Sequence, residues 1–169
     1  MIRYLEPLER IEDFKNLNDF LECNLNRDSD LKYLSYSMIG FDRPTIEDLT
    51  RSHRKNGLEY IGYIQDDRLN GIAAIKSDRL QGFELFLLII EQDQRQRGIG
   101  GKLVEACLNQ ARQAGYHSMD ASVMADNKRM LRLLITYDFI PIQIIPHARA
   151  DGMDLVKLRY YRLARTEQP

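Results

Sequence analysis

The chain has 169 residues, of which 44% are hydrophobic and 29% charged, and its formal net charge at pH 7 is -1. This composition is that of an ordinary globular protein and excludes a disordered, collagen-like or coiled-coil chain. A near-neutral chain lacks the surplus of basic residues expected of a dedicated nucleic-acid or membrane-surface binder. We therefore expect neither a nucleic acid nor a membrane among its partners.

The length fits one domain, which we place over residues 1–169, because a typical domain takes about 150 residues. Two cysteines, Cys23 and Cys107, are too few for a disulfide framework, and no apolar run typical of a signal peptide follows the N-terminus. The longest apolar run, 85–90, is far too short to span a bilayer. We expect a soluble protein of the cytoplasm.

The N-terminal third of the chain predicts a short strand at 1–6 and then a helix. Apolar residues recur at three- and four-residue steps over 10–26, which is the pattern of an amphipathic helix. Residues 28–44 are polar and irregular. A second helix is expected over 45–57, because a capping-box pattern opens this segment and a glycine closes it.

Three strands are expected in the middle of the chain. The first two, 58–65 and 70–76, are joined by a turn at 66–67; the Asn-Gly pair at 70–71 is a competing turn signal that would shorten the second strand. Gly82 then introduces the sequence FELFLLII, which is apolar on both faces near its end. Such a strand belongs at the centre of a sheet that is covered on both sides.

The rest of the chain alternates between helices and strands. The expected elements are a helix after the glycines at 98–101 that ends near Gly115, a strand at 116–123, a short helix at 127–137, and strands at 139–146 and 153–161 with a turn at 151–152. The order β-α-α-β-β-β-α-β-α-β-β describes one layered structure of the α+β or mixed α/β class.

The segment from Glu84 to Lys102 carries the strongest chemical signal, because an apolar strand leads into a glycine-rich turn and then an amphipathic helix. Glycines let backbone amides approach a ligand closely, and a helix N-terminus presents free N–H groups and a positive dipole end. Together these features form an anion site suited to a pyrophosphate. The candidate ligand-binding residues are Arg95, Gln96, Arg97, Gly98, Ile99, Gly100, Gly101 and Lys102.

The familiar phosphate-binding loops do not fit this segment. Leu103 stands where a dinucleotide fingerprint beginning at Gly98 requires glycine, and also where a P-loop requires serine or threonine. The alternative is a glycine-rich turn that merely connects the strand to the helix. Three glycines at a helix start, flanked by arginines, favour the anion site.

These residues resemble the GNAT superfamily of acyl-CoA-dependent N-acyltransferases. The segment 95–100 matches the family's Q/R-x-x-G-x-G/A pyrophosphate loop, and Asn127 and Phe139 match the spacing of a second family element. Two positions depart from the family: Leu134 stands where a tyrosine is frequent, and Asp138 where a glycine is usual. The resemblance covers nearly the whole chain.

The resemblance implies a central mixed, mostly antiparallel sheet of about seven strands flanked by about four helices. It also implies an acetyltransferase that moves an acetyl group from acetyl-CoA to a primary amine, by direct attack in a ternary complex and without a metal. The acceptor would be a small molecule or a peptide. A different reading stays open, in which the chain is a CoA-binding regulatory or interaction module with weak or no catalysis.

The resemblance further implies roles for individual residues. The central strand would separate from the strand at 116–123, the pantetheine arm would lie in the opening, and the backbone near Ile90 and Asn127 would contact the cofactor. Glu84, eleven residues before Arg95, is the candidate general base, since a carboxylate in an apolar site has a raised pKa. The alternative is a solvent-facing or salt-bridged strand glutamate.

A general acid is harder to assign, because Leu134 cannot donate a proton to the departing thiolate. Tyr137 is the nearby candidate, although its hydroxyl would be displaced by about 4.5 Å along the helix axis. The histidines His53, His117 and His147 stand at no metal-ligand spacing, so no metal site is expected. The C-terminal strands offer a surface for a homodimer.

Overall fold

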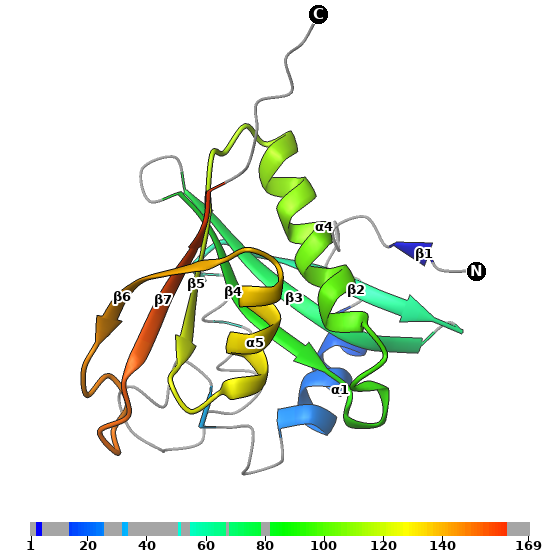
Figure 1. Ribbon diagram of the computed structural model, residues 1–169. Helices are drawn as coiled ribbons and strands as arrows, with labels where there is room; N and C mark the ends of the chain where they lie inside the picture. The colour runs from blue at the N-terminus through cyan, green and yellow to red at the C-terminus, as the bar shows by residue number, and fades with distance from the viewer. Residues whose placement is uncertain are drawn as a thin grey trace, which may run out of the picture.

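The structure, a computed structural model, describes residues 3–4, 14–25, 32–33, 51, 55–66, 68–78 and 82–161. Within these ranges seven strands form one sheet in the order β1-β2-β3-β4-β5-β7-β6 (Figure 1). The strands are β1 (Arg3–Tyr4), β2 (Leu58–Gln65), β3 (Arg68–Asp78), β4 (Gly82–Ile90), β5 (Met119–Met124), β6 (Ile140–Ile145) and β7 (Leu155–Tyr160). Only the pairing of β4 with β5 is parallel. The predicted mixed, mostly antiparallel sheet is confirmed.

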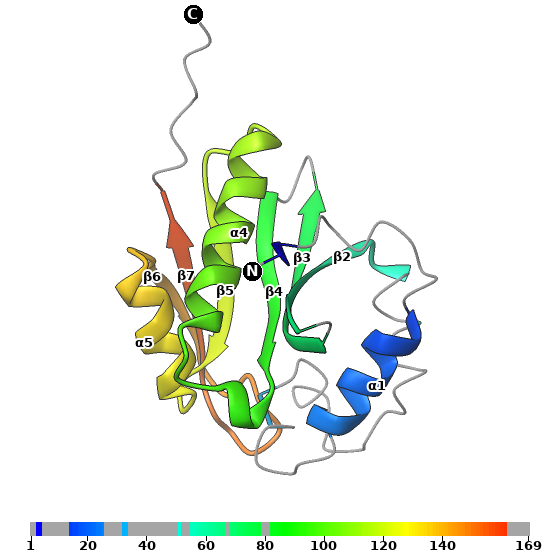
Figure 2. The ribbon, with the colours of Figure 1, turned by 90° about the vertical axis from the view of Figure 1, so that its right-hand side faces the viewer.

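Helices cover both faces of the sheet. Helix α1 (Phe14–Leu25) lies on one face, and α4 (Ile99–Gln113) and α5 (Lys128–Thr136) lie on the other, as Figures 1 and 2 show. A short 3-10 helix, η3 (Gln92–Gln94), lies between β4 and α4. Strand β4 is the middle strand and contributes to both apolar layers, with Leu85 in one and Ile89 in the other. Its predicted central place is confirmed.

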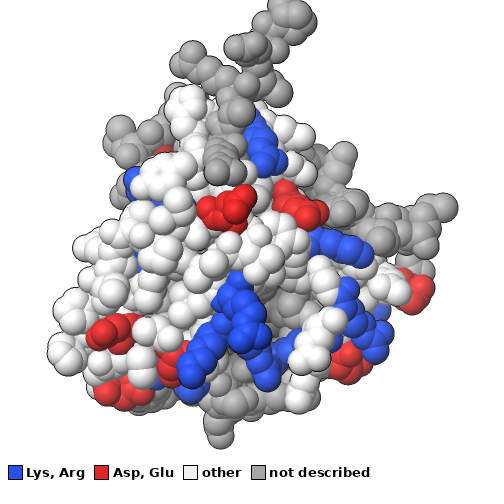
Figure 3. Space-filling model, viewed as in Figure 1, with Lys and Arg blue, Asp and Glu red and all other residues white. Residues whose placement is uncertain are grey.

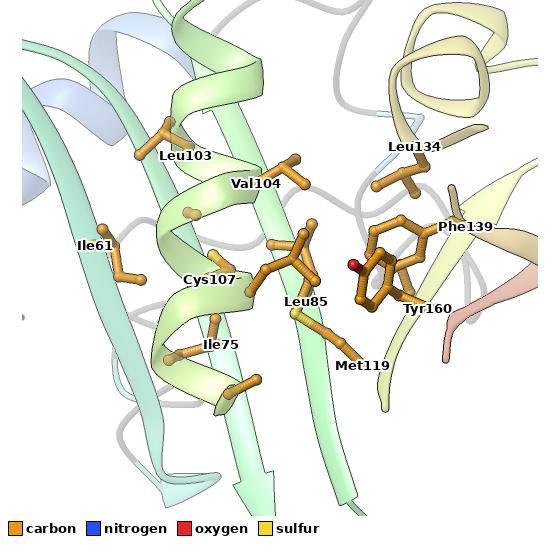
Figure 4. Packing of buried hydrophobic residues seen from close by; sticks show 14 of the residues in the cluster. Ile61, Ile75, Leu85, Leu103, Val104, Cys107, Met119, Leu134, Phe139 and Tyr160 are labelled. Carbon is orange, nitrogen blue, oxygen red and sulfur yellow. The ribbon is translucent and has the colours of Figure 1, made fainter. Parts of the chain in front are cut away.

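The larger apolar layer lies beneath α4 and α5. Five residues of α4 that the periodicity assigned to one helix face are all buried: Leu103, Val104, Cys107, Leu108 and Ala111. Figure 4 shows this face of α4 against the sheet, with Leu134, Phe139 and Tyr160 packed together under α5. Burying a large aliphatic or aromatic side chain contributes about 1.5–3 kcal/mol, so this layer fixes the position of α4 on the sheet.

Some predicted boundaries hold, and others shift by one to three residues. Gln65 pairs with Arg68 in register, so the chain turns between these two residues, and residues 70–71 lie inside β3. The strand predicted at 116–123 begins only at Met119. The reason is the end of α4, where the Tyr116 N–H donates to the Ala111 carbonyl and is thereby committed to closing the helix.

Parts of the N-terminal predictions lie outside the described residues, namely 10–13, 26, 28–31, 34–44 and most of the helix expected over 45–57. Arg51 and Lys55 are helical, and Gly57 follows with a φ of +66°, as a helix stop requires. No helix in the described part of the chain has the length and apolar character needed to cross a membrane.

Candidate functional site

The β4 and β5 strands separate halfway along β4. Their parallel pairing runs only from Phe83–Met119 to Leu85–Ala121, although both strands continue beyond it. On the other side of β4 the register against β3 shifts at the same level, because Ala74 pairs with Leu87 and Ile75 with Leu85. One extra residue on β4 therefore bends the strand away from β5. The opening next to the central strand, which the family resemblance implied, is present.

The glycine-rich connection follows directly from the separated end of β4. Gln96 and Gly98 both have positive φ, +64° and +78°, so the chain turns sharply twice before α4 begins. Gly98 is the N-cap of α4, and no side chain caps the helix there. The N–H groups of the first turn of α4 therefore have no intrahelical partner and, among the residues that the structure describes, no side-chain partner. An uncapped helix N-terminus of this kind attracts an anion.

The three glycines of the loop are needed for different reasons. A Cβ on Gly98 would touch nothing within 4 Å, so Gly98 is required by its left-handed φ. A Cβ on Gly100 would lie 3.2 Å from Leu133 Cδ2. A Cβ on Gly101 would collide with the Tyr137 hydroxyl. Gly100 and Gly101 therefore allow α5 to pack closely on the first turn of α4.

The basic side chains predicted around the loop point in different directions. Arg95 Nε donates to the Ile90 carbonyl at 3.1 Å and ties the loop back to the end of β4. Lys102 Nζ lies 3.5 Å from the Tyr63 hydroxyl and 5.2 Å from the centroid of its ring. Arg97 is exposed. Arg97 is thus the loop cation that extends into solvent, and Arg95 holds the loop closed.

Asn127 has a defined structural role at the start of α5. Its side-chain oxygen accepts a hydrogen bond from the Met130 N–H at 3.2 Å, which is N-cap geometry. At the other end of α5, Asp138 has a φ of +64°. This explains why the family usually has glycine at that position, since left-handed backbone favours glycine and tolerates aspartate better than most residues.

Glu84 lies at the level where the strands separate, on the face opposite α4. Its neighbours Phe83 and Leu85 belong to the layer beneath α4, and strand alternation directs Glu84 to the other face. The Ser122 hydroxyl donates to Glu84 Oε1 at 3.4 Å. Burial raises the pKa of the Glu84 carboxyl, while the Ser122 hydrogen bond and the charges of Lys76 and Lys157 offset part of that rise.

A row of charged residues crosses the sheet through Glu84. The register places Lys76, Glu84, Asp120 and Arg159 side by side on β3, β4, β5 and β7. Arg159 binds Asp120 with two hydrogen bonds, of 2.6 and 2.8 Å. Asp120 is therefore committed to Arg159. Glu84 keeps a weaker set of contacts, which leaves its carboxylate able to accept a proton.

Tyr137 and Leu134 occupy the positions considered for a general acid. The Tyr137 hydroxyl donates to Glu105 Oε1 at 3.1 Å, and burial together with Glu105 raises its pKa. Leu134 is fully buried in the apolar layer. Tyr137 thus contacts α4, and Leu134 fills the core. Cys107 is also core, and burial raises the pKa of its thiol to about 12.

A buried arginine that no sequence pattern predicted joins three loops. Arg149, 3% exposed, binds Asp126 after β5 and Asp151 before β7, each with two hydrogen bonds. It also donates to the Lys32 carbonyl at 3.3 Å. No local pattern around residue 149 shows this network. The acidic residues at 126 and 151 were the signal in the sequence that could have indicated the network, but such residues are typical of ordinary turns.

The chain matches the family model described as the acetyltransferase (GNAT) family over residues 22–136. Among the curated proteins no sequence matches.

Solved acetyltransferase structures share the fold. A putative acetyltransferase from Acinetobacter baylyi ADP1 is 20% identical with a TM-score of 0.74, and the match covers 100% of this chain and 97% of that one. Ard1 from Thermoplasma volcanium is 16% identical with a TM-score of 0.74, covering 97% and 98%. The ribosomal-protein-S18-alanine N-acetyltransferase from Escherichia coli is 16% identical with a TM-score of 0.71, covering 100% and 98%.

Proposed function

The chain belongs to the GNAT family of acetyltransferases, and we propose that it transfers an acetyl group from acetyl-CoA to a primary amine in a ternary complex. The observation that carries this proposal is the uncapped N-terminus of α4 behind Gly98, next to the opening between β4 and β5. The pyrophosphate of the cosubstrate would bind the free N–H groups of α4. The pantetheine arm would follow the separated strands towards the middle of β4.

The residues proposed for binding and catalysis surround this path. Residues 95–102 would hold the pyrophosphate, with Ile90 and Asn127 along the pantetheine arm. One acceptor group of each of these last two residues is already used within the protein. The Ile90 carbonyl already accepts from Arg95, and the Asn127 side-chain oxygen already caps α5. Their remaining backbone and amide groups are the ones offered to the cofactor.

The chemistry requires a neutral amine. An ammonium acceptor would lose a proton to Glu84, directly or through a water, and the amine nitrogen would then attack the thioester carbon. Donors near Ile90 would stabilise the oxyanion while the new C–N bond forms. The C–S bond then breaks and CoA leaves as a thiolate, which takes up, directly or through a water, the proton that the new amide nitrogen loses. Because a simple thiol has a pKa of about 8.5, the thiolate departs readily without strong help from an acid.

One observation favours the second candidate, a CoA-binding module with weak or no catalysis. Leu134 lies in the core, so no hydroxyl stands at the position where many relatives have a tyrosine, and the Tyr137 hydroxyl binds Glu105 instead. Such a protein would bind acetyl-CoA without transferring its acetyl group.

An acceptor screen separates the two candidates. The purified protein is incubated with acetyl-CoA and a panel of amines, including peptides with a free N-terminal alanine, lysine peptides, polyamines and amino sugars. Release of free thiol and acetylated amine detected by mass spectrometry would support the transferase. Saturable acetyl-CoA binding with no product from any acceptor class would favour the binding module.

A further inference from the structure

Two lysines flank Glu84 on the sheet face opposite α4. Lys76 pairs with Glu84 across β3 and β4, and Lys157 pairs across β5 and β7 with Ser122, the residue that donates to Glu84. Residues paired in register point to the same face of a sheet, and neighbouring strands lie about 4.8 Å apart. Both lysines therefore stand around the Glu84 carboxylate. Their charges reach it, because both lower the pKa of Glu84.

Neither lysine has an anionic partner of its own within the described part of the chain. The ion pairs found there include neither Lys76 nor Lys157. Asp120, which stands next to Glu84 in the row across the sheet, is bound by Arg159 through two hydrogen bonds. Both lysines are half-buried, so solvent screens their charges only in part.

These lysines oppose the role proposed for Glu84. A general base for an ammonium works better with a raised pKa, and Lys76 and Lys157 lower that of Glu84. They also repel the positive charge of an incoming ammonium. An acceptor that is only a cation, such as a polyamine, would meet two unfavourable charges beside the base. An acceptor that pairs its amine with an anionic group would meet two favourable ones.

The phosphates of the cosubstrate do not account for the two lysines. The proposed pyrophosphate site lies at the start of α4, and α4 covers the other face of the sheet. Figure 3 shows that other face, where Lys and Arg side chains gather over α5 and over the β4–α4 connection. Lys76 and Lys157 point away from it, to the face that carries Glu84.

The part of the Glu84 face that β5 and β7 form lies beside α1 rather than beneath it. Helix α1 packs on β2, β3 and β4, and no residue of β5 or β7 belongs to that apolar layer. Ser122 is exposed between Glu84 and Lys157. It follows directly after the last parallel pair of β4 and β5, Leu85–Ala121, and is therefore level with the opening. An acceptor over Ser122 would reach the base, Lys157 and the arriving thioester together.

We propose that the acceptor is a small amine that also carries an anionic group a few bonds from its nitrogen, and that Lys76 and Lys157 bind this group while Glu84 takes the proton. The inference rests on the proposed function, because it takes Glu84 as the base and acetyl-CoA as the donor. It deepens that function by naming the acceptor class. A lysine ammonium is a compact charge with three donors, so a carboxylate or a phosphonate fits it.

Matched acceptors test the inference on the full chain. The panel contains amino acids of different side chain and chain length, the carboxamide of each, and the corresponding aminoalkylphosphonates. Release of the CoA thiol at saturating acetyl-CoA gives kcat/KM for each amine. The wild type should favour the anionic acceptors over the carboxamides by about tenfold or more, since hydrogen bonds to charged groups contribute on that scale. The carboxamide has the less basic amine, so amine basicity would favour the carboxamide and does not produce this preference.

The double variant Lys76→Gln/Lys157→Gln should lose the preference. Its kcat/KM for the anionic acceptors should fall to that for the carboxamides, while KM for acetyl-CoA stays unchanged. Loss of the lysines also changes the pKa of Glu84, but this acts on both members of each acceptor pair and cancels in their ratio. Each single variant should lose part of the preference, so the test is decisive even where the double variant does not fold.

Arg112→Gln is the matched control for loss of a half-buried cation, because Arg112 lies on α4 and so on the other face of the sheet. It should keep the wild-type ratio. Equal kcat/KM of the wild type for anionic acceptors and carboxamides, a preference for polyamines, or an unchanged ratio in the lysine variants would overturn the inference and leave the proposed function intact. Saturable acetyl-CoA binding without a product from any amine would contradict both.

Discussion

Glu84 combines the properties that a general base for an ammonium acceptor needs. Burial raises its pKa, and its strongest described contact is a single hydrogen bond of 3.4 Å from Ser122. Its neighbour Asp120 accepts two hydrogen bonds from Arg159, of 2.6 and 2.8 Å, and is therefore not available to accept a proton from the acceptor. Of these two neighbouring carboxylates, Glu84 is therefore the one able to take a proton.

Replacing Glu84 with glutamine should lower kcat roughly 100-fold, because general base catalysis contributes on that scale, while acetyl-CoA affinity barely changes. The wild-type rate should decline as the pH falls through the raised pKa of Glu84, since the protonated carboxyl cannot accept a proton. Glu84→Gln should lack this acid limb. The measurement is kcat against pH with an identified acceptor.

Glu59→Gln is the matched control, because Glu59 is an exposed carboxylate on β2 that accepts from Gln110. It should behave like the wild type. Near-normal turnover and an unchanged acid limb in Glu84→Gln would assign the base to another residue or to a chain of water molecules.

The geometry around Tyr137 argues against the general-acid role predicted for it. Its hydroxyl donates to Glu105, and its raised pKa makes it a poor proton donor to a thiolate. We expect Tyr137→Phe to change kcat by less than about threefold, far below the 100-fold or more that loss of a general acid typically costs. Steady-state kinetics check this. A fall of that larger size, with CoA affinity and thermal midpoint unchanged, would show that Tyr137 is the acid.

At the scale of elements, the contact between α4 and α5 determines the shape of the site. The first turn of α4 supplies the proposed pyrophosphate site, and α5 packs against that turn through Leu133 and Tyr137. Glycines at 100 and 101 make this approach possible. From the sequence, both glycines were predicted only to bind a ligand, because the partner residues are more than thirty positions away and no local pattern connects them.

Gly101→Ala tests this packing. Within a helix this substitution normally stabilises a protein by up to about 1 kcal/mol. Here the new methyl group would collide with the Tyr137 hydroxyl, so the variant should be destabilised by about 1 kcal/mol or more. Chemical denaturation of the wild type and the variant measures the difference.

The same substitution in a Tyr137→Phe background supplies the control. Loss of the hydroxyl removes the atom nearest to the new methyl group, so Gly101→Ala should then cost less. An equal cost in both backgrounds, or a stabilised single variant, would show that α5 does not press on Gly101.

The element boundaries show which signals in the sequence are reliable. The periodicity of apolar residues predicted β4 and α4 correctly, because both segments are long. One face of α4 and both faces of β4 are buried. The start of β5 was placed three residues too early, because the hydrogen bond from Tyr116 to Ala111 that ends α4 depends on the helix being formed. The opening between β4 and β5 was expected only from the family resemblance, since strand pairing across 35 residues leaves no local pattern.

At the scale of the molecule, Arg149 connects segments that are far apart in sequence. It binds Asp126 beside the start of α5, Asp151 in the β6–β7 connection and the carbonyl of Lys32. Arg149 is buried, and the two carboxylates compensate its charge there. No sequence pattern predicts this network, because each member on its own is typical of a polar turn.

Arg149→Gln should lower the free energy of unfolding by about 1.5–3 kcal/mol at neutral pH, because hydrogen bonds to charged groups contribute on that scale and the two carboxylates left behind are partly exposed. The Arg149 hydrogen bonds lower the pKa of Asp126. This stabilisation is complete above the ordinary aspartate pKa of about 3.9 and is lost as the pH falls through the lowered value. The difference between wild type and variant should therefore shrink in acid. A difference that is constant from neutral pH to below pH 3 would contradict this account.

The central claim is that the loop between β4 and α4 holds acetyl-CoA, and a charge change without a change of shape tests it most directly. Gln96→Glu places a carboxylate in the loop, whereas the matched variant Gln113→Glu places one at the far end of α4; both glutamines are exposed. Calorimetric titration should show saturable acetyl-CoA binding to the wild type and to Gln113→Glu. In Gln96→Glu the affinity should fall roughly five- to tenfold, because like charges about 4 Å apart repel by about 1 kcal/mol or more near a protein surface. Equal affinities in all three folded proteins would contradict the assignment of the loop.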